Sequence, residues 1–299
     1  MRAIVTGGAG FIGSHVVDAL LARGDEVHVL DDLSKGTRDN VTAGAELHVA
    51  DIREPEAVFD TVRPEAVFHF AAQADVRFSV QSPAVDAEMN IFGTLQVLEA
   101  ARRYDAQVVL ASTGGAIYGE CDGRPATEST PRQPLSPYGT SKLAAEEYLA
   151  TYNRLYDAGH VSLRLSNVYG PRQAVHGEAG VVAIFTGLLR DGGTPQIFGD
   201  GTQTRDYVYV RDVARATLAA LGRGGVFNIG TGLETSVLEL YEALARASGV
   251  ARLAEHVPAR LGELQRSVLD VSLAARELDW TPEVTLEDGL ARTWEWATA

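Results

Sequence analysis

Cysteine is almost absent from this chain of 299 residues, and Cys121 is the only one. A single thiol excludes an intrachain disulfide and a metal site built from cysteines. Basic residues are also scarce, because 26 Lys and Arg face 40 Asp and Glu, which leaves a formal net charge of −14. Such an acidic chain is a poor partner for nucleic acid or for an anionic membrane. No apolar run reaches the ~18 residues of a membrane-spanning helix.

Targeting and metal-binding signals are missing as well. The first apolar strand starts at residue 3, which leaves no room for an N-terminal targeting segment. The seven histidines contain no His-Glu-x-x-His pair, the usual helical zinc motif. We therefore expect a cytoplasmic protein, and we assign no metal site. With 45% hydrophobic residues, the chain is long enough for a substantial core in one large domain or two lobes.

The chain opens on a strand, a glycine turn and a helix. Residues 3–5 are apolar, Gly7, Gly10 and Gly13 follow, and apolar residues then recur at helical spacing. Glycines let the backbone approach a phosphate, and the helix N-terminus directs free N–H groups and a positive dipole at its charge. The spacing predicts a variant dinucleotide loop, with a plain turn before a helix as the alternative.

The second predicted strand, residues 27–30, ends in an acid. Asp31 lies about 20 residues after the glycine loop, where a carboxylate can bind the adenosine ribose and would repel a 2′-phosphate. We therefore favour NAD over NADP. Lys35 and Arg38 are a counterweight, since they could hold that phosphate.

Strands and helices continue to alternate along the first half of the chain. Further strands are predicted at residues 47–50, 67–70, 107–111 and 162–165. A long helix runs from Pro83 to about Arg103, with Asn90 in its middle. This order predicts an α/β fold with a Rossmann-type, doubly wound parallel sheet.

Two groups suited to proton transfer follow the fifth strand. Ser112 and Thr113 end that strand, where the ligand crevice of such a sheet lies. Tyr138 and Lys142 stand four residues apart on one face of a predicted helix. An ammonium group this close should stabilise the phenolate and lower the tyrosine pKa from about 10. The tyrosine could then exchange a proton with a sugar or alcohol hydroxyl. A surface pair is the alternative, and the preceding motifs disfavour it.

The regular alternation ends near residue 166. We expect an NAD-binding domain in residues 1–166 and a smaller C-terminal α/β substrate-binding lobe in residues 167–299, with some elements returning to the main sheet. Residues 173–180 are polar and contain glycine, and they look like a loop over the substrate.

The order of these motifs resembles the extended short-chain dehydrogenase/reductases over the whole chain, and within them the UDP-glucose 4-epimerases. The resemblance is carried by the glycine loop, Asp31, Asp51-Ile52, Ser112-Thr113, Tyr138-x-x-x-Lys142, Asn167, Arg205-Asp206-Tyr207 and Arg260-Leu-Gly-Glu263. It implies NAD as cofactor, a UDP-sugar as substrate and a homodimer formed through the helices after Pro83 and Tyr138.

The resemblance also implies individual roles. Cofactor contacts would come from Gly7, Gly10, Phe11 and Ile12 at the pyrophosphate, Asp31 at the ribose, Asp51 and Ile52 at the adenine, and Phe70, Ala71, Ala72, Asn90, Ser112, Tyr138 and Lys142 along the rest. Substrate contacts would come from Asn167, Arg205 and Arg260 at the phosphates, Phe198 at the uracil, Glu263 at the nucleoside, and Thr113 and Tyr138 at the sugar. Tyr138, Lys142 and Thr113 would be catalytic.

The sequence departs from the family at one catalytic position. The family's Ser or Thr usually stands four residues before Tyr118, where this chain has Gly114. We expect Thr113 to supply the missing hydroxyl, with direct action of Tyr138 as the alternative.

The expected activity is the interconversion of UDP-glucose and UDP-galactose through a transient 4-keto sugar. A UDP-glucuronate 4-epimerase or decarboxylase is the alternative, and the small Ser267, where some glucose-specific relatives have Tyr, would admit an N-acetylated sugar. A 4,6-dehydratase is disfavoured, because Gly114 and Gly115 stand where it needs an acid/base pair. A non-catalytic NAD-binding sensor would not need Tyr138 and Lys142 together.

Overall fold

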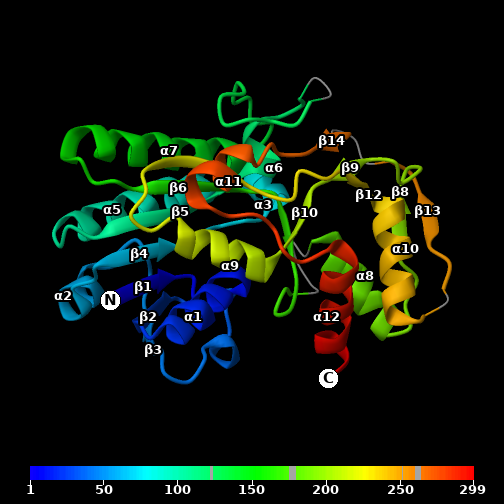
Figure 1. Cartoon of the computed structure of the whole chain (residues 1–299), viewed down its shortest axis with the longest axis horizontal. Coiled ribbons are helices and arrows are strands. Elements are labelled where there is room, and N and C mark those ends of the chain that lie inside the picture. The colour runs from blue at the N-terminus through cyan, green and yellow to red at the C-terminus, as the bar shows by residue number, and fades with distance from the viewer. Residues whose placement is uncertain (122–123, 175–179, 251, 260–263) are drawn as a thin grey trace.

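A seven-stranded sheet forms the centre of the molecule (Figure 1). The computed structural model describes residues 1–121, 124–174, 180–250, 252–259 and 264–299. Across the sheet the strands follow the order β3 (Glu46–Val49), β2 (Glu26–Asp31), β1 (Arg2–Thr6), β4 (Ala66–His69), β5 (Gln107–Thr113), β6 (Val161–Leu165) and β11 (Gly225–Ile229). All six pairings between them are parallel. The predicted α/β fold with a doubly wound parallel sheet is confirmed.

Helices cover both faces of this sheet, as its apolar strands require. One face packs against α1 (Phe11–Arg23), α9 (Val210–Ala219) and α11 (Ser272–Leu278). The other packs against α2 (Glu56–Val62), α5 (Gly93–Arg102) and α7 (Pro137–Tyr156). The chain thus forms three layers, with the carboxyl ends of the strands left uncovered for a ligand.

The second half of the chain builds a smaller lobe beside the sheet (Figure 1). Its core lies among α8 (Val181–Arg190), α10 (Val237–Ser248) and α12 (Leu286–Thr298). Short strands join it: β7 (Asn167–Tyr169) pairs with β10 (Tyr207–Tyr209), β8 (Gln196–Phe198) with β13 (Glu255–Val257), and β9 (Thr204–Arg205) with both β12 (Thr235–Ser236) and β14 (Arg266–Ser267).

Besides α11, two further elements from this second half belong to the main sheet rather than to the small lobe. Strand β11 pairs with β6 from Gly225↔Val161 to Ile229↔Leu165. Helix α9 packs along α1, and its Val213 and Ala216 are fully buried in the same core. The sheet is therefore completed by residues distant in sequence, and the domain boundary at residue 166 stays a prediction.

The long helix expected from Pro83 is interrupted in its middle. It consists of α4 (Pro83–Ala87), a π-helical turn η2 (Glu88–Phe92) and α5, and a separate helix α3 (Val76–Gln81) precedes it. Asn90 lies in the π-turn and is 1% exposed. A π-turn widens the helix locally and is common at functional sites; here it presents the Asn90 side chain to buried partners, described below.

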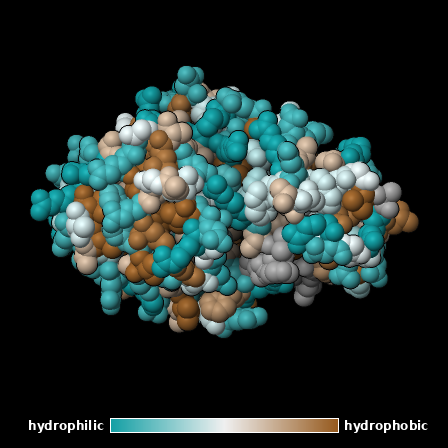
Figure 2. Space-filling model, turned by 90° about the horizontal axis from the view of Figure 1, so that it is seen from below, coloured by the Kyte–Doolittle hydropathy of each residue, from teal (hydrophilic) through white to brown (hydrophobic). Residues whose placement is uncertain are grey.

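The surface is mostly hydrophilic on the face seen from below, and hydrophobic residues gather over the wider part that holds the sheet (Figure 2). None of the helices in the described ranges combines the length and the hydropathy that crossing a membrane takes.

Candidate active site

A cavity of about 440 Å³ opens at the carboxyl ends of the sheet strands. Many of the predicted site residues line it: Gly7, Gly10, Phe11, Ile12, Asp31, Ile52, Phe70, Ala71, Ala72, Ser112, Thr113, Tyr138, Lys142 and Asn167. The parallel topology gathers them, because each strand in turn delivers its last residues to the same edge of the sheet.

The glycine loop is fitted closely to its neighbours. Gly7 has a φ of +69°, and a Cβ there would lie 2.6 Å from the backbone nitrogen of Ala71. Only glycine tolerates both constraints. Helix α1 then begins at Gly10 without a side-chain cap, so its first N–H groups and the positive end of its dipole face the cavity. This combination suits a phosphate group.

Asp31 is held with both carboxylate oxygens in use. The Ala9 N–H donates to Oδ2 at 3.0 Å and the Leu33 N–H donates to Oδ1 at 2.9 Å. Burial raises the pKa of this carboxyl, and the two backbone donors oppose the rise. The backbone therefore fixes the direction of the carboxylate at the cavity wall, where each oxygen has a second lone pair for a ribose hydroxyl.

Tyr138 and Thr113 line the same cavity, and the Thr113 side chain stabilises the phenolate and so lowers the Tyr138 pKa. Helix α7 starts where it does because Ser136 caps it, accepting from the Gly139 N–H at 3.1 Å, and Pro137 occupies its first turn. Tyr138 thus stands in the first turn, facing the end of β5. Thr113 precedes the short helix α6 (Gly114–Ile117) without capping it, which leaves its hydroxyl available to Tyr138.

The pKa of Tyr138 is not lowered as the sequence predicted. Burial raises it to about 12, the Thr113 side chain lowers it, and the charge of Asp86 adds to the rise. Burial likewise lowers the pKa of Lys142 to about 8, against the opposing charges of Glu146 and Asp86. The prediction is therefore wrong for the protein alone, because the desolvation of Tyr138 outweighs the stabilisation of its phenolate by Thr113.

The structure explains the glycine at position 114. A Cβ on Gly114 would lie 2.5 Å from Cδ1 and 2.8 Å from Cδ2 of Leu269, and 3.2 Å from the carbonyl oxygen of Arg164. Leu269 is 1% exposed and belongs to a core cluster, so it cannot move aside cheaply. The usual serine or threonine has no room here, and Thr113 is the neighbouring hydroxyl residue that lines the cavity with Tyr138.

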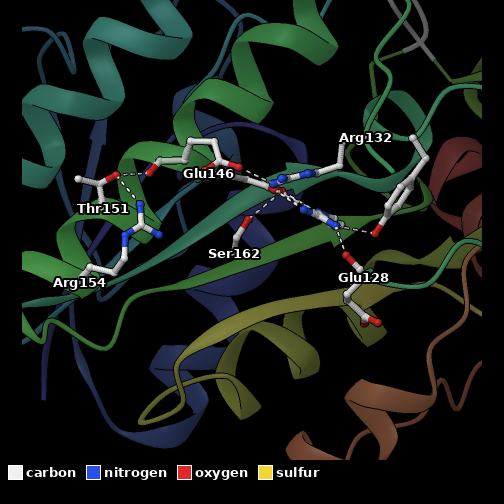
Figure 3. Close-up of polar contacts among 9 residues, drawn as sticks. Glu128, Arg132, Glu146, Thr151, Arg154 and Ser162 are labelled. Carbon is white, nitrogen blue, oxygen red and sulfur yellow. Dashed lines mark hydrogen bonds and ion pairs between the residues drawn. The ribbon is translucent and has the colours of Figure 1, made fainter. Parts of the chain in front are cut away.

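The catalytic helix α7 is anchored by a buried ion pair (Figure 3). Glu146 accepts from Arg164 on β6, with Nη2 to Oε2 at 2.7 Å and Nε to Oε1 at 3.0 Å. Arg164 also donates to the Tyr118 hydroxyl at 2.8 Å, and Ser162 donates to Glu146 at 3.1 Å. Both charged side chains are at most 3% exposed. Because Glu146 follows Lys142 by one helical turn, this pair fixes the face of α7 that carries Lys142 and Tyr138.

Comparison with known proteins decides the family. The model of the NAD dependent epimerase/dehydratase family matches residues 3–230. The chain belongs to this family. It is 47% identical over 306 residues to the UDP-glucose 4-epimerase of Mycolicibacterium smegmatis, with 99% of this chain and 98% of that protein covered.

Two solved structures of the family are closely similar to this chain. The UDP-glucose 4-epimerase of Thermotoga maritima, solved with UDP-glucose, has a TM-score of 0.97 and 46% identity, and the alignment covers 99% of this chain and 98% of that one. The UDP-glucose 4-epimerase of Thermus thermophilus, solved with NAD, has a TM-score of 0.94 and 46% identity, with 99% of each chain covered.

The cavity fits the dinucleotide for which the family is named. The uncapped α1 suits its pyrophosphate and Asp31 suits a ribose, as described above. In addition, the Ser112 hydroxyl is buried without a hydrogen-bond partner among the described residues, and it lines the cavity. A buried hydroxyl of this kind is costly unless a ligand or water satisfies it.

Asn90 lies behind the cavity rather than on its wall. Its Nδ2 donates to the Ser141 hydroxyl at 3.0 Å and to Asp86 Oδ1 at 3.1 Å, and its Oδ1 accepts from the Gln73 N–H at 2.9 Å. These bonds join η2 to α7 and to the loop after β4, which carries Ala71 and Ala72. Asn90 therefore holds together the elements that form the cavity wall. Its direct contact with a cofactor stays a prediction.

Other predicted residues stand apart from this cavity. Asp51 is paired with Arg53, and Phe198 ends β8 in the small lobe. Arg205 is half-buried in β9, where its Nη1 donates to the Thr204 carbonyl at 2.8 Å. Arg260 and Glu263 lie outside the described residues. Their roles stay predictions.

The cavity also has walls outside the predicted site residues, although the sequence analysis had named Gly13 in the glycine loop and Lys35 near Asp31. They are Gly13, Asp32, Ser34, Lys35, Gly36, Ala50, Ala74, Met89, Ala111, Leu165, Ser166, Val168, Gln173 and Gly180. Several directly follow a predicted strand end, so extending each strand end by a few residues would have found them. Gln173 and Gly180 fall within the predicted substrate loop, of which residues 175–179 lie outside the described part.

Proposed function

We propose that this protein is a UDP-glucose 4-epimerase that interconverts UDP-glucose and UDP-galactose, with NAD as its cofactor. The observation that carries the proposal is that Tyr138, Thr113 and Lys142 line one cavity together with the glycine loop. An acid/base group beside a dinucleotide site is what reversible oxidation of a sugar hydroxyl requires. Close similarity to UDP-glucose 4-epimerases over nearly the whole chain supports it.

The residues divide the work between chemistry and positioning. Tyr138, as the phenolate, takes the proton from O4 of the sugar, and Thr113 holds O4 and the phenol oxygen in line. Bound NAD would supply what the chain lacks, a reversible hydride acceptor for C4, and the positive charge of its oxidised form would favour the phenolate of Tyr138. Tyr138 then gives the proton back to O4 on the inverted carbon. Net oxidation is zero.

Inversion requires that the 4-keto sugar turn over between the two steps while its nucleotide stays bound. Asn167, Arg205 and Arg260 are proposed to hold the diphosphate, and Phe198 to contact the uracil. Arg205 lies in β9, next to Ser267 of β14 in register. Because Ser267 is small and neighbours a residue proposed to bind the diphosphate, we propose UDP-N-acetylglucosamine as a second substrate.

The deciding experiment incubates the purified protein with UDP-glucose, UDP-galactose, UDP-N-acetylglucosamine and UDP-glucuronate, without added cofactor, and separates the products. We expect conversion of the first two and its loss in Tyr138→Phe. Conversion of UDP-glucuronate alone would replace the proposal with the glucuronate activity. If NAD-loaded protein converted none of the sugars, the epimerase proposal would fall and a non-catalytic NAD-binding sensor would remain as the alternative. If UDP-N-acetylglucosamine alone were not converted, dual specificity would be refuted.

We also propose that the enzyme is a homodimer formed through α7 and the segment from α3 to η2. These elements contact each other, and together they expose large apolar side chains: Phe78, Val80, Val85, Phe92, Tyr148, Leu155 and Tyr156. Large apolar side chains exposed on elements that contact each other favour association with a second copy. Light scattering at micromolar concentration should give twice the chain mass for the wild type. The double variant Leu155→Glu, Phe92→Glu should give the mass of a single chain. A wild-type monomer would refute the proposal.

The site of action is proposed to be the cytoplasm. The single half-buried cysteine and the absence of a disulfide suit a reducing compartment. Fractionation of cells that produce the protein tests this, and recovery with a membrane or secreted fraction would contradict it.

A further inference from the structure

The exposed edge of the main sheet carries the same short motif on two neighbouring strands. Strand β2 contains Glu26-Val27-His28 and strand β3 contains Glu46-Leu47-His48. The parallel register pairs His28 with Glu46 and Leu30 with His48. Since side chains two residues apart point to the same face of a strand, the four polar side chains gather on one face at this edge (Figure 1 shows the two strands).

Three of these side chains direct their polar atoms at one point. His28 Nδ1 lies 3.0 Å from His48 Nε2. Glu46 Oε2 lies 3.6 Å from His28 Nδ1, and Glu46 Oε1 lies 3.7 Å from His48 Nε2. Tetrahedral zinc holds N and O ligands about 2.0–2.2 Å from the metal, which places the ligand atoms about 3.3–3.5 Å from one another. One oxygen of the Glu46 carboxylate faces each nitrogen, and one ligand atom from each of the three side chains lies within 4.8 Å of the other two. These separations are close enough for small rotations of the side chains to bring three ligand atoms around one ion.

The fourth side chain, Glu26, orients His28 through a hydrogen bond to its second ring nitrogen, as carboxylates commonly do for histidines that bind a metal. The second ring nitrogen of His28, Nε2, lies 3.1 Å from Glu26 Oε1. A carboxylate in this place holds the N–H of that nitrogen and leaves Nδ1 with its lone pair for a metal. His28 is 8% exposed, so its ring is already fixed by packing before any ion binds.

A hydrogen bond between the two imidazoles explains only part of this arrangement. It accounts for the 3.0 Å between the ring nitrogens, but the Glu46 carboxylate approaches both nitrogens from beyond hydrogen-bond distance. A shared cation accounts for the approach of all three side chains at once. The rings lie 5.3 Å apart at an interplanar angle of 32°, and Glu46 is exposed, so a fourth position is open to water.

We propose that His28, His48 and Glu46 form a site for one divalent transition-metal ion, with Glu26 orienting His28. Two imidazoles and one carboxylate suit Zn²⁺ best among common ions, whereas Mg²⁺ and Ca²⁺ prefer oxygen ligands alone. The ion joins β3, the edge strand, to β2. Its role is structural, since none of its ligands lines the active-site cavity.

The test starts from chelator-treated protein in the Cys121→Ser background, which removes the one free thiol as a competing ligand. Calorimetry with ZnCl₂ should show one site per chain, and Co²⁺ should give visible absorption bands typical of low coordination number. At a free Zn²⁺ concentration of about 100 times Kd, the thermal midpoint should rise by about 5 °C. The same concentration of Mg²⁺ should leave it unchanged.

Variants locate the site. His48→Gln should abolish the Zn²⁺ binding and the rise in midpoint, while His256→Gln, which changes an exposed histidine of the small lobe, should keep both. Glu46→Gln alters only an exposed side chain and should weaken binding at least tenfold without loss of folding. Zn²⁺ binding that survives in His48→Gln, or no binding to the parent protein below millimolar concentration, would overturn the proposal.

Discussion

At the scale of single residues, the site depends on how burial and charge act on Tyr138 and Lys142. Burial favours the neutral form of each group, so it raises the pKa of Tyr138 to about 12 and lowers the pKa of Lys142 to about 8. The reaction needs the opposite pair of states, a phenolate and an ammonium. Three neighbours shift this balance: Thr113, which stabilises the phenolate, and the carboxylates of Asp86 and Glu146.

Thr113→Val tests whether Thr113 replaces the hydroxyl that Gly114 cannot supply. Valine keeps the shape but removes the hydroxyl. We expect kcat to fall about 10- to 100-fold, against a loss of about 100-fold or more in Tyr138→Phe. Steady-state assays with UDP-galactose measure both. If Thr113→Val kept nearly full turnover while Tyr138→Phe lost it, Tyr138 would act on the sugar directly.

Asp86 provides a second prediction at this scale, about pH dependence. It is 1% exposed, and its Oδ2 has no hydrogen-bond partner among the described residues. Its charge raises the pKa of both Tyr138 and Lys142. Removing the charge in Asp86→Asn should lower both values, so both limbs of the pH profile should move to lower pH.

The measurement is the pH profile of kcat/KM for the wild type and Asp86→Asn. Other charged or titratable groups around Lys142 are Glu146 of α7, which raises its pKa, and His69 of β4, whose own pKa is held at about 3 by burial. Because His69 stays neutral over the assay range, it does not contribute a limb. A lower rate with unmoved limbs would show that Asp86 acts only through its hydrogen bonds.

At the scale of elements, the catalytic helix owes its placement to contacts that its own sequence does not contain. Capping by Ser136 decides where α7 starts. The ion pair of Glu146 with Arg164 of β6 fixes the rotation of α7 about its axis. The hydrogen bond from Asn90 of η2 to Ser141 holds α7 against the neighbouring helix. Local sequence predicts the first of these, whereas the other two need the sheet and the π-turn to be in place.

The buried pair gives a prediction for stability. Arg164→Met leaves Glu146 buried without its partner and should lower the free energy of unfolding by about 3–5 kcal/mol. Replacing both, with Glu146→Leu added, should recover most of that loss. The exposed pair of Arg132 with Glu147 on the same helix (Figure 3) is the control, and Arg132→Ala should cost less than about 1 kcal/mol. Urea unfolding measures all four proteins, and a double variant less stable than Arg164→Met would contradict the interpretation.

At the scale of the whole molecule, the two halves of the chain are not independent. Strand β11 closes one edge of the sheet, and α9 covers α1. Trp280, which is 2% exposed, lies in the same core and donates its indole N–H to the Asp212 carbonyl at 3.0 Å. The part that binds the cofactor thus includes residues from the last quarter of the chain.

A fragment of residues 1–166 should therefore fail to fold alone. It would leave β6 as an unpaired edge and uncover the apolar face of α1, which favours aggregation. We expect an aggregated or partly folded product without a cooperative urea transition, next to a cooperative one for the full chain. A fragment that unfolds cooperatively and binds NAD would show that the domain boundary predicted at residue 166 is an autonomous one.

Local patterns in the sequence determined the strands, the glycine turn, the start of α7 and the order of the motifs, because hydrophobic period, glycine and capping residues act over a few positions. These patterns suffice to bring Gly7, Asp31, Thr113 and Tyr138 to one edge of the sheet. The tertiary structure alone decided which long-range neighbours they meet. Leu269 fills the space beside Gly114, Asp86 and Glu146 add charge near Lys142, and burial reverses the expected shift in the pKa of Tyr138. Distance in sequence hides all of these, since packing and desolvation depend on what the folded chain brings alongside.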